Sequence, residues 1–270
     1  MKRLGKWKIG LIGVGNMGTS ILEGVLRKGI ASPSQIWVYD KIVAKARGFA
    51  RKTRVHCAAS AVELLDKSDV VMLAQKPQDF APFAAEHKYF FRPGHCVISI
   101  LAGLTTERIR EAFGGKAEVV RAMPNLGAKV GESMTAVCGK NKKWIAFAEN
   151  LFSGCGAVVR LPEKSFDLVT AVSGSGPAYF FHLMELMADF GVMQGLPANV
   201  AATLAVQTGL GAALLAKGSE HSCAELREKV TSKKGTTDAA LKVLKQKKFG
   251  RIFHRALAAA MVRSRQLRKK

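Results

Sequence analysis

Cysteine is scarce in this 270-residue sequence: its five positions are scattered, odd in number and never spaced C-x-x-C. The six histidines also lack any metal-ligand spacing such as H-E-x-x-H. A disulfide framework needs paired cysteines, and a zinc site needs closely spaced ligands. The sequence therefore excludes a disulfide-stapled domain and predicts a protein without a bound metal ion.

A long uninterrupted apolar segment is also missing, although 48% of the residues are hydrophobic, which is enough for a folded core. The most apolar stretch, residues 201–216, is short for a membrane span and contains Thr203, Gln207 and Thr208. We interpret it as a buried helix. The basic start of the chain precedes a glycine-broken apolar run without a cleavage-type ending, so the expected location is cytoplasmic.

Acidic residues number only 20 against 42 Lys and Arg, which gives a formal net charge of +22. From Arg227 onward, 15 basic residues face only Glu228 and Asp238. Such a surface either keeps the protein soluble or binds phosphates, including those of nucleic acid. We favour a solvated basic surface because no nucleic-acid recognition motif accompanies the charge.

Short apolar runs alternate with helical patterns in the first part of the sequence. Strands are predicted at residues 8–13, 35–40, 69–74, 95–100 and 118–123, the last of which closes the series. Between them, helices are predicted at residues 18–28, 43–52, 59–66 and 106–113. This alternation predicts βαβ units, and hence an α/β Rossmann domain with a doubly wound, mostly parallel sheet.

The pattern changes near residues 161–166. After Pro162 only helical periodicity is found, over residues 177–190, 197–217, 223–231, 238–247 and 249–267. The helix predicted at 197–217 is crowded with small residues, and its region is apolar on more than one face, which indicates a helical partner from a second subunit. We therefore predict a Rossmann domain at 1–162 and an all-α dimerisation domain at 163–270.

Gly13-Val-Gly-Asn-Met-Gly18 is a complete G-x-G-x-x-G motif between a predicted strand and a predicted helix. The first glycine makes the turn, the second lets a pyrophosphate approach the backbone, and the third lets the helix pack on the strand. The motif therefore predicts a nicotinamide or flavin dinucleotide. The alternative is a tight glycine turn without a ligand.

Asp40 ends the second predicted strand, where a carboxylate accepts the ribose hydroxyls of NADH and repels a 2′-phosphate. Four basic residues that could instead neutralise that phosphate follow it: Lys41, Lys45, Arg47 and Arg51. Asp40 could also serve only to cap the next helix. The pattern favours NADH and leaves NADPH open.

Other motifs end strands or begin helices. The stretches 74–77, 100–103 and 121–125 each follow a strand, where open α/β sheets bind ligands. Ser173-Gly-Ser-Gly-Pro-Ala-Tyr179 is interpreted as a tight helix entry, since a nucleophile elbow would need a preceding strand and a His–acid pair. The polar loop 230–238 could hold a carboxylate on its N–H groups and hydroxyls, although a simple Thr N-cap would need only one hydroxyl.

The order of these motifs resembles that of the pyrroline-5-carboxylate reductase family. G-x-G-N-M-G, A-x-K-P, S-x-x-A-G, R-A-M-P-N, S-G-S-G-P-A-Y and T-S-x-x-G-T-T follow one another over nearly the whole chain. The resemblance implies a cytoplasmic enzyme that reduces 1-pyrroline-5-carboxylate to L-proline with NADPH or NADH. It also implies a helical domain that interlocks two subunits, in dimers or in decamers built from them.

By position, the resemblance and the motifs together assign site residues. The expected cofactor-binding residues are Ile12, Gly13, Val14, Gly15, Asn16, Met17, Gly18, Asp40, Ala74, Gln75, Lys76, Pro77, Ile100, Leu101 and Ala102. The expected substrate-binding residues are Glu163, Ser232, Gly235, Thr236 and Thr237. Thr237 is also the candidate for hydrogen bonding the ring nitrogen during hydride transfer.

The chain departs from the family pattern in three places. Leu126-Gly127 replaces a usual T-P, Lys233-Lys234 replaces P-G, and Ala61 stands where relatives commonly have an Asn on the cofactor. The lost glycine at 234 removes the residue best suited to a positive φ. Two alternatives remain open. One is a β-hydroxyacid-type dehydrogenase, which is disfavoured because it would require a catalytic lysine on the interdomain helix and residues 177–190 contain none. The other is a non-catalytic basic paralogue that binds nucleic acid or has a regulatory role.

Overall fold

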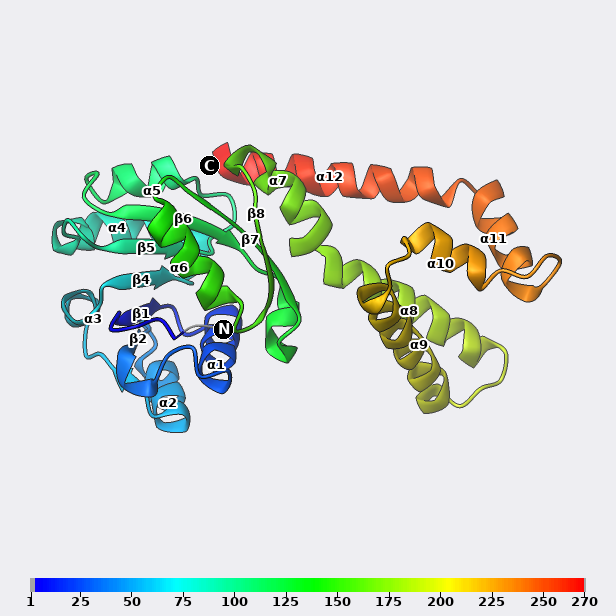
Figure 1. The fold of residues 1–270 in the computed structure, drawn as a ribbon, viewed down its shortest axis with the longest axis horizontal. Helices are drawn as coiled ribbons and strands as arrows, with labels where there is room; N and C mark the ends of the chain where they lie inside the picture. The colour runs from blue at the N-terminus through cyan, green and yellow to red at the C-terminus, as the bar shows by residue number, and fades with distance from the viewer. Residues whose placement is uncertain (1–2, 270) are drawn as a thin grey trace. The chain divides into compact units, whose positions relative to one another are not determined.

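A computed structural model describes residues 3–269 of the chain. The helices and strands form two compact units. The first contains the chain through Gly174 and again from Ala260, and the second contains residues 175–259. Figure 1 shows the elements coloured along the chain, and each unit is described by itself.

An eight-stranded sheet lies at the centre of the first unit. Its strands are β1 (Ile9–Ile12), β2 (Ile36–Tyr39), β3 (His56–Cys57), β4 (Val70–Leu73), β5 (Cys96–Ser99), β6 (Glu118–Met123), β7 (Ser133–Gly139) and β8 (Gly156–Arg160). The order is β3-β2-β1-β4-β5-β6-β7-β8, and every neighbouring pair is parallel except β6 and β7. This confirms the predicted doubly wound, mostly parallel sheet.

Helices cover both faces of the sheet (Figure 1). They are α1 (Asn16–Arg27), α2 (Val43–Thr53), α3 (Ala61–Lys67), α4 (Phe80–His87), α5 (Thr106–Ala112), α6 (Lys142–Phe152) and α7 (Phe166–Val169). Side chains of α1, α2 and α6 pack in one apolar cluster, and those of α3, α4 and α5 pack in another. Short turns of other helical type occur at η1 (Pro33–Gln35), η2 (Pro77–Asp79), η3 (Lys88–Phe90), η4 (Leu126–Val130), η5 (Glu163–Ser165) and η6 (Thr170–Gly174).

The sheet does not end at β6, and in this respect the prediction that residues 118–123 close the series is wrong. β7, α6 and β8 follow, and β7 turns back antiparallel to β6. The sequence of β7, Ser-Met-Thr-Ala-Val-Cys-Gly, is nearly buried throughout and mixes small polar with apolar residues, so it shows no alternation. Burial on both faces removes the period-two signal on which a strand prediction depends.

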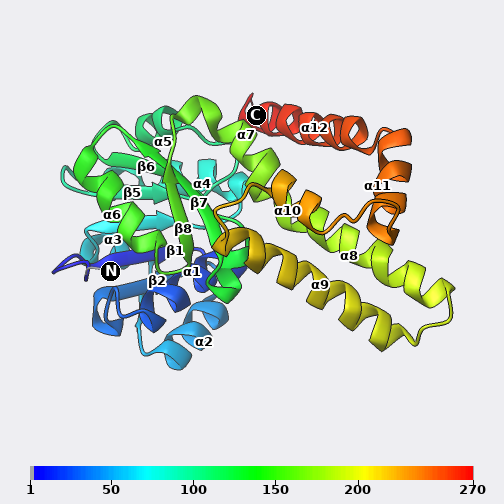
Figure 2. The same cartoon turned by 45° about the vertical axis from the view of Figure 1, so that its right-hand side comes forward.

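The second unit is helical, as predicted. Its helices are α8 (Gly176–Met193), α9 (Ala198–Gly218), α10 (Cys223–Lys229) and α11 (Thr236–Gln246), and α12 (Phe249–Lys269) begins there and ends in the first unit. α8 and α9 lie side by side in both views (Figures 1 and 2). Gly191 on α8 favours this close approach, because a Cβ there would lie 3.0 Å from the Cβ of Ala201 on α9.

The prediction that residues 201–216 form a buried helix is wrong for the single chain. α9 is largely exposed, and its most apolar window is only 11% buried. Of its residues, Ala201 and Ala205 are buried, on the side that faces α8. Among the residues described, α9 is the one helix long and apolar enough to cross a membrane by length and composition alone, which is weak evidence for a span.

The compact units differ from the predicted ranges 1–162 and 163–270. The segment from Glu163 to Gly174 packs with the sheet: Phe166 is fully buried beside Ala136 and Cys138. The last turns of α12 also belong to the first unit. The composition changes after Pro162, but the packing boundary lies about one short helix further along the chain.

Candidate functional site

The turn between β1 and α1 presses the glycines of the G-x-G-x-x-G motif against the end of β4. Gly13 has φ +95°, and a Cβ there would lie 2.6 Å from the backbone nitrogen of Gln75. A Cβ on Gly18 would lie 2.9 Å from the Gly13 carbonyl oxygen and 3.0 Å from the Cβ of Ala74. A larger residue at position 13 or 18 would therefore separate the turn from β4.

Gly15, the middle glycine, leaves the turn open. A Cβ there would meet nothing within 4 Å. Gly15 is the N-cap of α1, and among residues 3–269 no side chain caps this helix start. The first N–H groups of α1 thus face a space that a side chain at position 15 would fill. This geometry fits the pyrophosphate of a dinucleotide, which the N-terminal end of the helix dipole also favours.

Two further loops meet this turn at the carboxyl edge of the sheet. The Ala74 N–H donates to the Ile12 carbonyl at 2.8 Å, and the Ile100 N–H donates to the Leu73 carbonyl at 3.1 Å. The predicted cofactor residues of 12–18, 74–77 and 100–102 therefore line one edge. The chain turns to opposite sides of the sheet after β1 and β4, and such a switch point is where open α/β sheets bind ligands.

Asp40 follows β2 at the same edge. One carboxylate oxygen accepts the Val14 N–H at 2.7 Å, and the other accepts the Ile42 N–H at 2.8 Å. Asp40 thus holds the glycine turn and the residue before α2, but it does not cap that helix, whose N-cap is Ile42 and which has no side-chain cap among the described residues. A carboxylate has about four lone-pair sites, so two stay open for ribose hydroxyls. Lys41, by contrast, pairs with Asp79 at 2.9 Å.

Glu163 lies in η5, and its carboxylate contacts two other residues of the first unit. Its carboxylate accepts the Thr106 N–H at 2.8 Å and the Thr106 hydroxyl at 2.7 Å, which fixes the start of α5. It also pairs at 3.4 Å with Arg121, which is 2% exposed and stacks on the Phe166 ring at 4.7 Å. Sequence reasoning gave Arg121 no role, although a charged residue inside an apolar strand was the available signal.

The R-A-M-P-N and S-G-S-G motifs join behind this edge. The Asn125 side-chain amide donates to the Ser173 carbonyl and hydroxyl at 3.3 and 3.2 Å. A Cβ on Gly174 would lie 2.7 Å from the terminal methyl of Met123. Among the family departures, Gly127 fits its loop closely, because a Cβ there would collide with the Glu132 carbonyl.

The remaining predicted site residues form a loop before α11 in the second unit. Gly235 is the N-cap of α11, Ser232 folds over it, and Thr236 and Thr237 begin the helix. Within residues 3–269, the hydroxyls of Ser232, Thr236 and Thr237 form no hydrogen bond. Three hydroxyls and a helix start therefore stay available to an anion.

The Lys233-Lys234 departure does not abolish the positive φ that the lost glycine would supply. Lys234 itself adopts φ +62°. Its N–H donates to Asp238 at 3.0 Å, and Lys242 donates to the same carboxylate oxygen at 2.9 Å. Lys242, and then the Lys234 N–H, hold the pKa of Asp238 below its ordinary value. The loop therefore keeps its turn at the expense of a lysine in a left-handed conformation.

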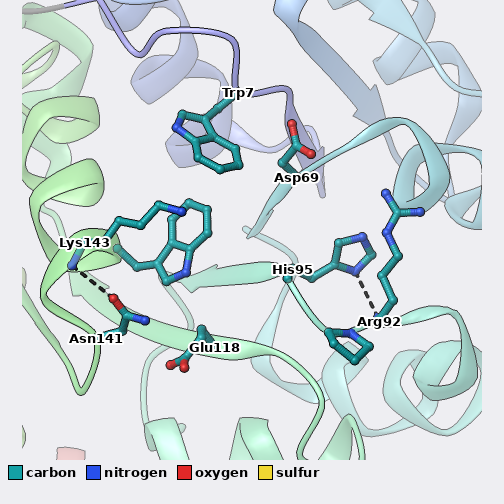
Figure 3. Close-up of a pocket in the computed structure, with 10 residues that line it drawn as sticks. Trp7, Asp69, Arg92, His95, Glu118, Asn141 and Lys143 are labelled. Carbon is teal, nitrogen blue, oxygen red and sulfur yellow. Dashed lines mark hydrogen bonds between the residues drawn. The ribbon is translucent and has the colours of Figure 1, made fainter.

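A pocket of about 490 Å³ lies at the opposite, amino-terminal edge of the sheet (Figure 3). The ammonium of Lys143 lies over the rings of Trp7 and Trp144 at 4.3 and 4.5 Å. His95 and Glu118 border the same pocket. The pocket touches none of the predicted site residues, so it is separate from the cofactor edge. Among the residues described, no group of three His, Cys, Asp or Glu side chains could hold a metal ion.

The glycine turn, the switch point and the helical second unit define a Rossmann-type dinucleotide-binding protein with an α-helical partner domain. Family models agree: residues 8–103 match "NADP oxidoreductase coenzyme F420-dependent", and residues 163–267 match "Pyrroline-5-carboxylate reductase dimerisation". The chain belongs to the pyrroline-5-carboxylate reductase family.

Relatives and solved structures support this over the full length. The chain is 40% identical to the pyrroline-5-carboxylate reductase of a Synechocystis species, over 97% of this chain and 99% of that protein. It is 35% identical to that of Methanosarcina acetivorans, over 97% and 98%. The Coxiella burnetii reductase structure is similar with a TM-score of 0.91 at 34% identity, over 98% of this chain and 100% of that one. The NADP-bound Plasmodium falciparum structure gives 0.86 at 27%, over 97% and 98%.

The first prediction concerns the loop before α11. Lys234→Gly should raise the free energy of unfolding by about 0.5–1 kcal/mol, because glycine takes a positive φ without the steric cost that lysine bears. The matched control is Lys233→Gly, whose residue has no positive φ and which should not stabilise. Urea unfolding of both variants checks this. Equal effects at the two positions would contradict it.

The second prediction concerns His95, which is 1% exposed at the start of β5. Burial, helped by the nearby Arg92 and opposed by Asp69, lowers the pKa of His95 below its ordinary value of 6.5. The folded state therefore disfavours the charged ring, and stability should fall as the pH drops below about 6.5. In His95→Gln this fall should be smaller than in wild type. Thermal unfolding of both proteins between pH 7.5 and 5.5 measures it, and identical slopes would refute the assignment.

Proposed function

We propose that the chain reduces 1-pyrroline-5-carboxylate to L-proline with NADH or NADPH. The observation that carries the proposal is the glycine turn packed on β4, with an open Gly15 and a helix start without a side-chain cap. Family membership and the NADP reported for the Plasmodium falciparum relative support it.

The cofactor-binding residues in this proposal lie at the ends of neighbouring strands. Residues 12–18 hold the pyrophosphate, Asp40 holds the adenosine ribose, and 74–77 with 100–102 line the nicotinamide half. The order β2-β1-β4-β5 supports this, because it places the ribose acceptor and the loop after β5 on opposite sides of the glycine turn. A dinucleotide is long enough to extend along such an edge.

The reaction adds a hydride to the imine carbon and leaves a proton on the ring nitrogen, so that C=N⁺H becomes CH–NH. The reduced nicotinamide supplies the hydride when bound. The chain itself binds the carboxylate of the substrate and orients the ring. We assign the carboxylate to the Ser232–Thr237 loop and the ring nitrogen to the Thr237 hydroxyl, because the three hydroxyls of the loop are unengaged. Glu163 is assigned to the substrate side by position only, since its carboxylate also fixes Thr106.

The active form in this proposal is a homo-oligomer, a dimer or a decamer built from dimers, in the cytoplasm. Large apolar side chains stand out from α8 and α9 of the single chain, among them Phe180, Phe181, Phe190, Leu204 and Leu214. Each is more than half exposed. Large apolar side chains gathered and exposed on neighbouring helices normally mark an interface, and the helical region matches a dimerisation domain. Neither a membrane nor nucleic acid is required as a partner.

One assay tests the proposed function. Oxidation of NADH and of NADPH is followed by absorbance with and without 1-pyrroline-5-carboxylate. We expect oxidation only when the imine is present, without any added metal ion. The proposal would be overturned if the cofactor were oxidised equally with and without the imine. It would also be overturned if the protein oxidised no cofactor and instead bound nucleic acid with an affinity that falls as the salt concentration rises.

The third prediction tests the substrate loop. Thr237→Ala should lower kcat/KM for pyrroline-5-carboxylate by roughly 10–100-fold, since one or two hydrogen bonds to the substrate are lost. The KM for the cofactor should hardly change. Thr203→Ala is the matched control, because that hydroxyl bonds only within its own helix, to the Asn199 carbonyl at 2.7 Å. Full activity of Thr237→Ala, or an effect on the cofactor alone, would place the substrate elsewhere.

The fourth prediction tests cofactor choice. Asp40→Ser should shift the ratio of kcat/KM values toward NADPH by about tenfold or more, because a charged acceptor for the ribose is removed. Lys41→Ala should change the ratio little, since Lys41 already pairs with Asp79. Steady-state kinetics with both cofactors provide the measurement. A wild type that strongly prefers NADPH, with no change in Asp40→Ser, would show that the basic residues of α2 decide instead.

A further inference from the structure

The last turns of α12 run directly against the loop that follows β5. Gly103, in that loop, has φ +78°, and a Cβ there would lie 3.1 Å from the backbone carbon and oxygen of Leu267. The side chain of Arg108, on α5, donates to the Arg268 carbonyl at 3.2 Å. In both Figure 1 and Figure 2 the red end of α12 lies beside α7. Residues 267 and 268 of α12 thus form one wall of the 100–103 loop.

A buried carboxylate holds this end of α12 in place. Asp167 on α7 is 4% exposed, and one of its oxygens accepts the Ser264 hydroxyl at 2.8 Å. Its other oxygen lies 3.5 Å from the Arg268 guanidinium and 3.9 Å from that of Arg265. Ser264 is itself buried. A buried carboxylate is stable only when it is paired, so α7 and the end of α12 must stay together.

The same loop is fixed at both of its ends by the sheet unit. The Leu101 N–H donates to the Ser99 hydroxyl at 3.2 Å, just after β5. At the far end Glu163 accepts both the N–H and the hydroxyl of Thr106. Between these two anchors, the three described atoms nearest to a Cβ on Gly103 are backbone atoms of α12, at 3.1 to 3.3 Å. The middle of the loop therefore depends on where α12 ends.

We propose that the Asp167–Ser264 contact is a latch that positions the nicotinamide half of the cofactor through the 100–103 loop. The inference rests on the proposed cofactor edge, in which residues 100–102 line that half. Asp167 and Ser264 are positioning residues: they act through the loop and touch neither cofactor nor substrate. The adenosine half, held at β2 and the glycine turn, lies outside the reach of the latch.

The test compares two ligands that differ in the nicotinamide. Dissociation constants of NADH and of ADP-ribose, which lacks the nicotinamide, are measured for wild type, Ser264→Ala and Asp167→Asn. Thr53→Ala is the matched control, because its hydroxyl bonds only within α2, to the Phe49 carbonyl at 2.7 Å. Ser264→Thr keeps the hydroxyl and serves as the conservative rescue. The primary deuterium isotope effect on kcat, with NADH labelled at the transferred position, reports on hydride alignment.

We expect Ser264→Ala to raise the dissociation constant of NADH by about three- to tenfold, in line with the loss of one hydrogen bond. The dissociation constant of ADP-ribose should change by less than about twofold. The kcat of Ser264→Ala should fall and the isotope effect should rise, and Asp167→Asn should do the same more strongly. Ser264→Thr and Thr53→Ala should match wild type. If Ser264→Ala weakened the binding of both ligands equally, or changed the binding of neither, the proposed role of the latch would be wrong. The two binding measurements need no substrate. They can therefore disprove the latch even if the wild-type protein binds NADH but does not reduce the imine, which would disprove the proposed function instead.

Discussion

The close approach of the β1–α1 turn to the end of β4 is the constraint on which the rest of the structure depends. Gly13 and Gly18 allow it, since a Cβ at either would collide with backbone or side-chain atoms of the 74–75 segment or of the turn itself. Once the turn is seated there, Asp40 can bond its Val14 N–H, and the start of α1 points into open space. The open start of α1 and the place of Asp40 beside the turn thus depend on two positions without a side chain.

Charged side chains with buried partners attach later parts of the chain to the loops around this edge. Glu163 joins Arg121 to the start of α5, and Asp167 joins α7 to the end of α12. Ion pairs of this kind add little net stability, but leaving one partner unpaired in the interior is costly. They therefore specify where the segments lie. The second unit contributes a different element, a loop of unengaged hydroxyls before α11.

Local patterns in the sequence were enough for the glycine turn, the parallel strands and the helical second part. Thr105 is one example: a threonine directly before the predicted helix 106–113 favours an N-cap, and its side chain accepts the Arg108 N–H. β7 and β8 were missed because burial on both faces, or a short exposed edge, leaves no clear period. The pairing of Glu163 with Arg121 cannot be predicted from the sequence around either residue, because the two lie 42 residues apart. The exposure of α9 was also unpredictable, because an apolar helix has the same sequence whether its own chain or another covers it.

We propose that this chain transfers a hydride from a nicotinamide bound at the β1–β4–β5 edge to a cyclic imine. The most direct test uses NADH deuterated at the transferred position, with 1-pyrroline-5-carboxylate, and analyses the product by mass spectrometry and NMR. We expect L-proline with one deuterium, on the carbon that was part of the C=N bond. Unlabelled proline, or label that stays in the cofactor while the imine persists, would contradict it.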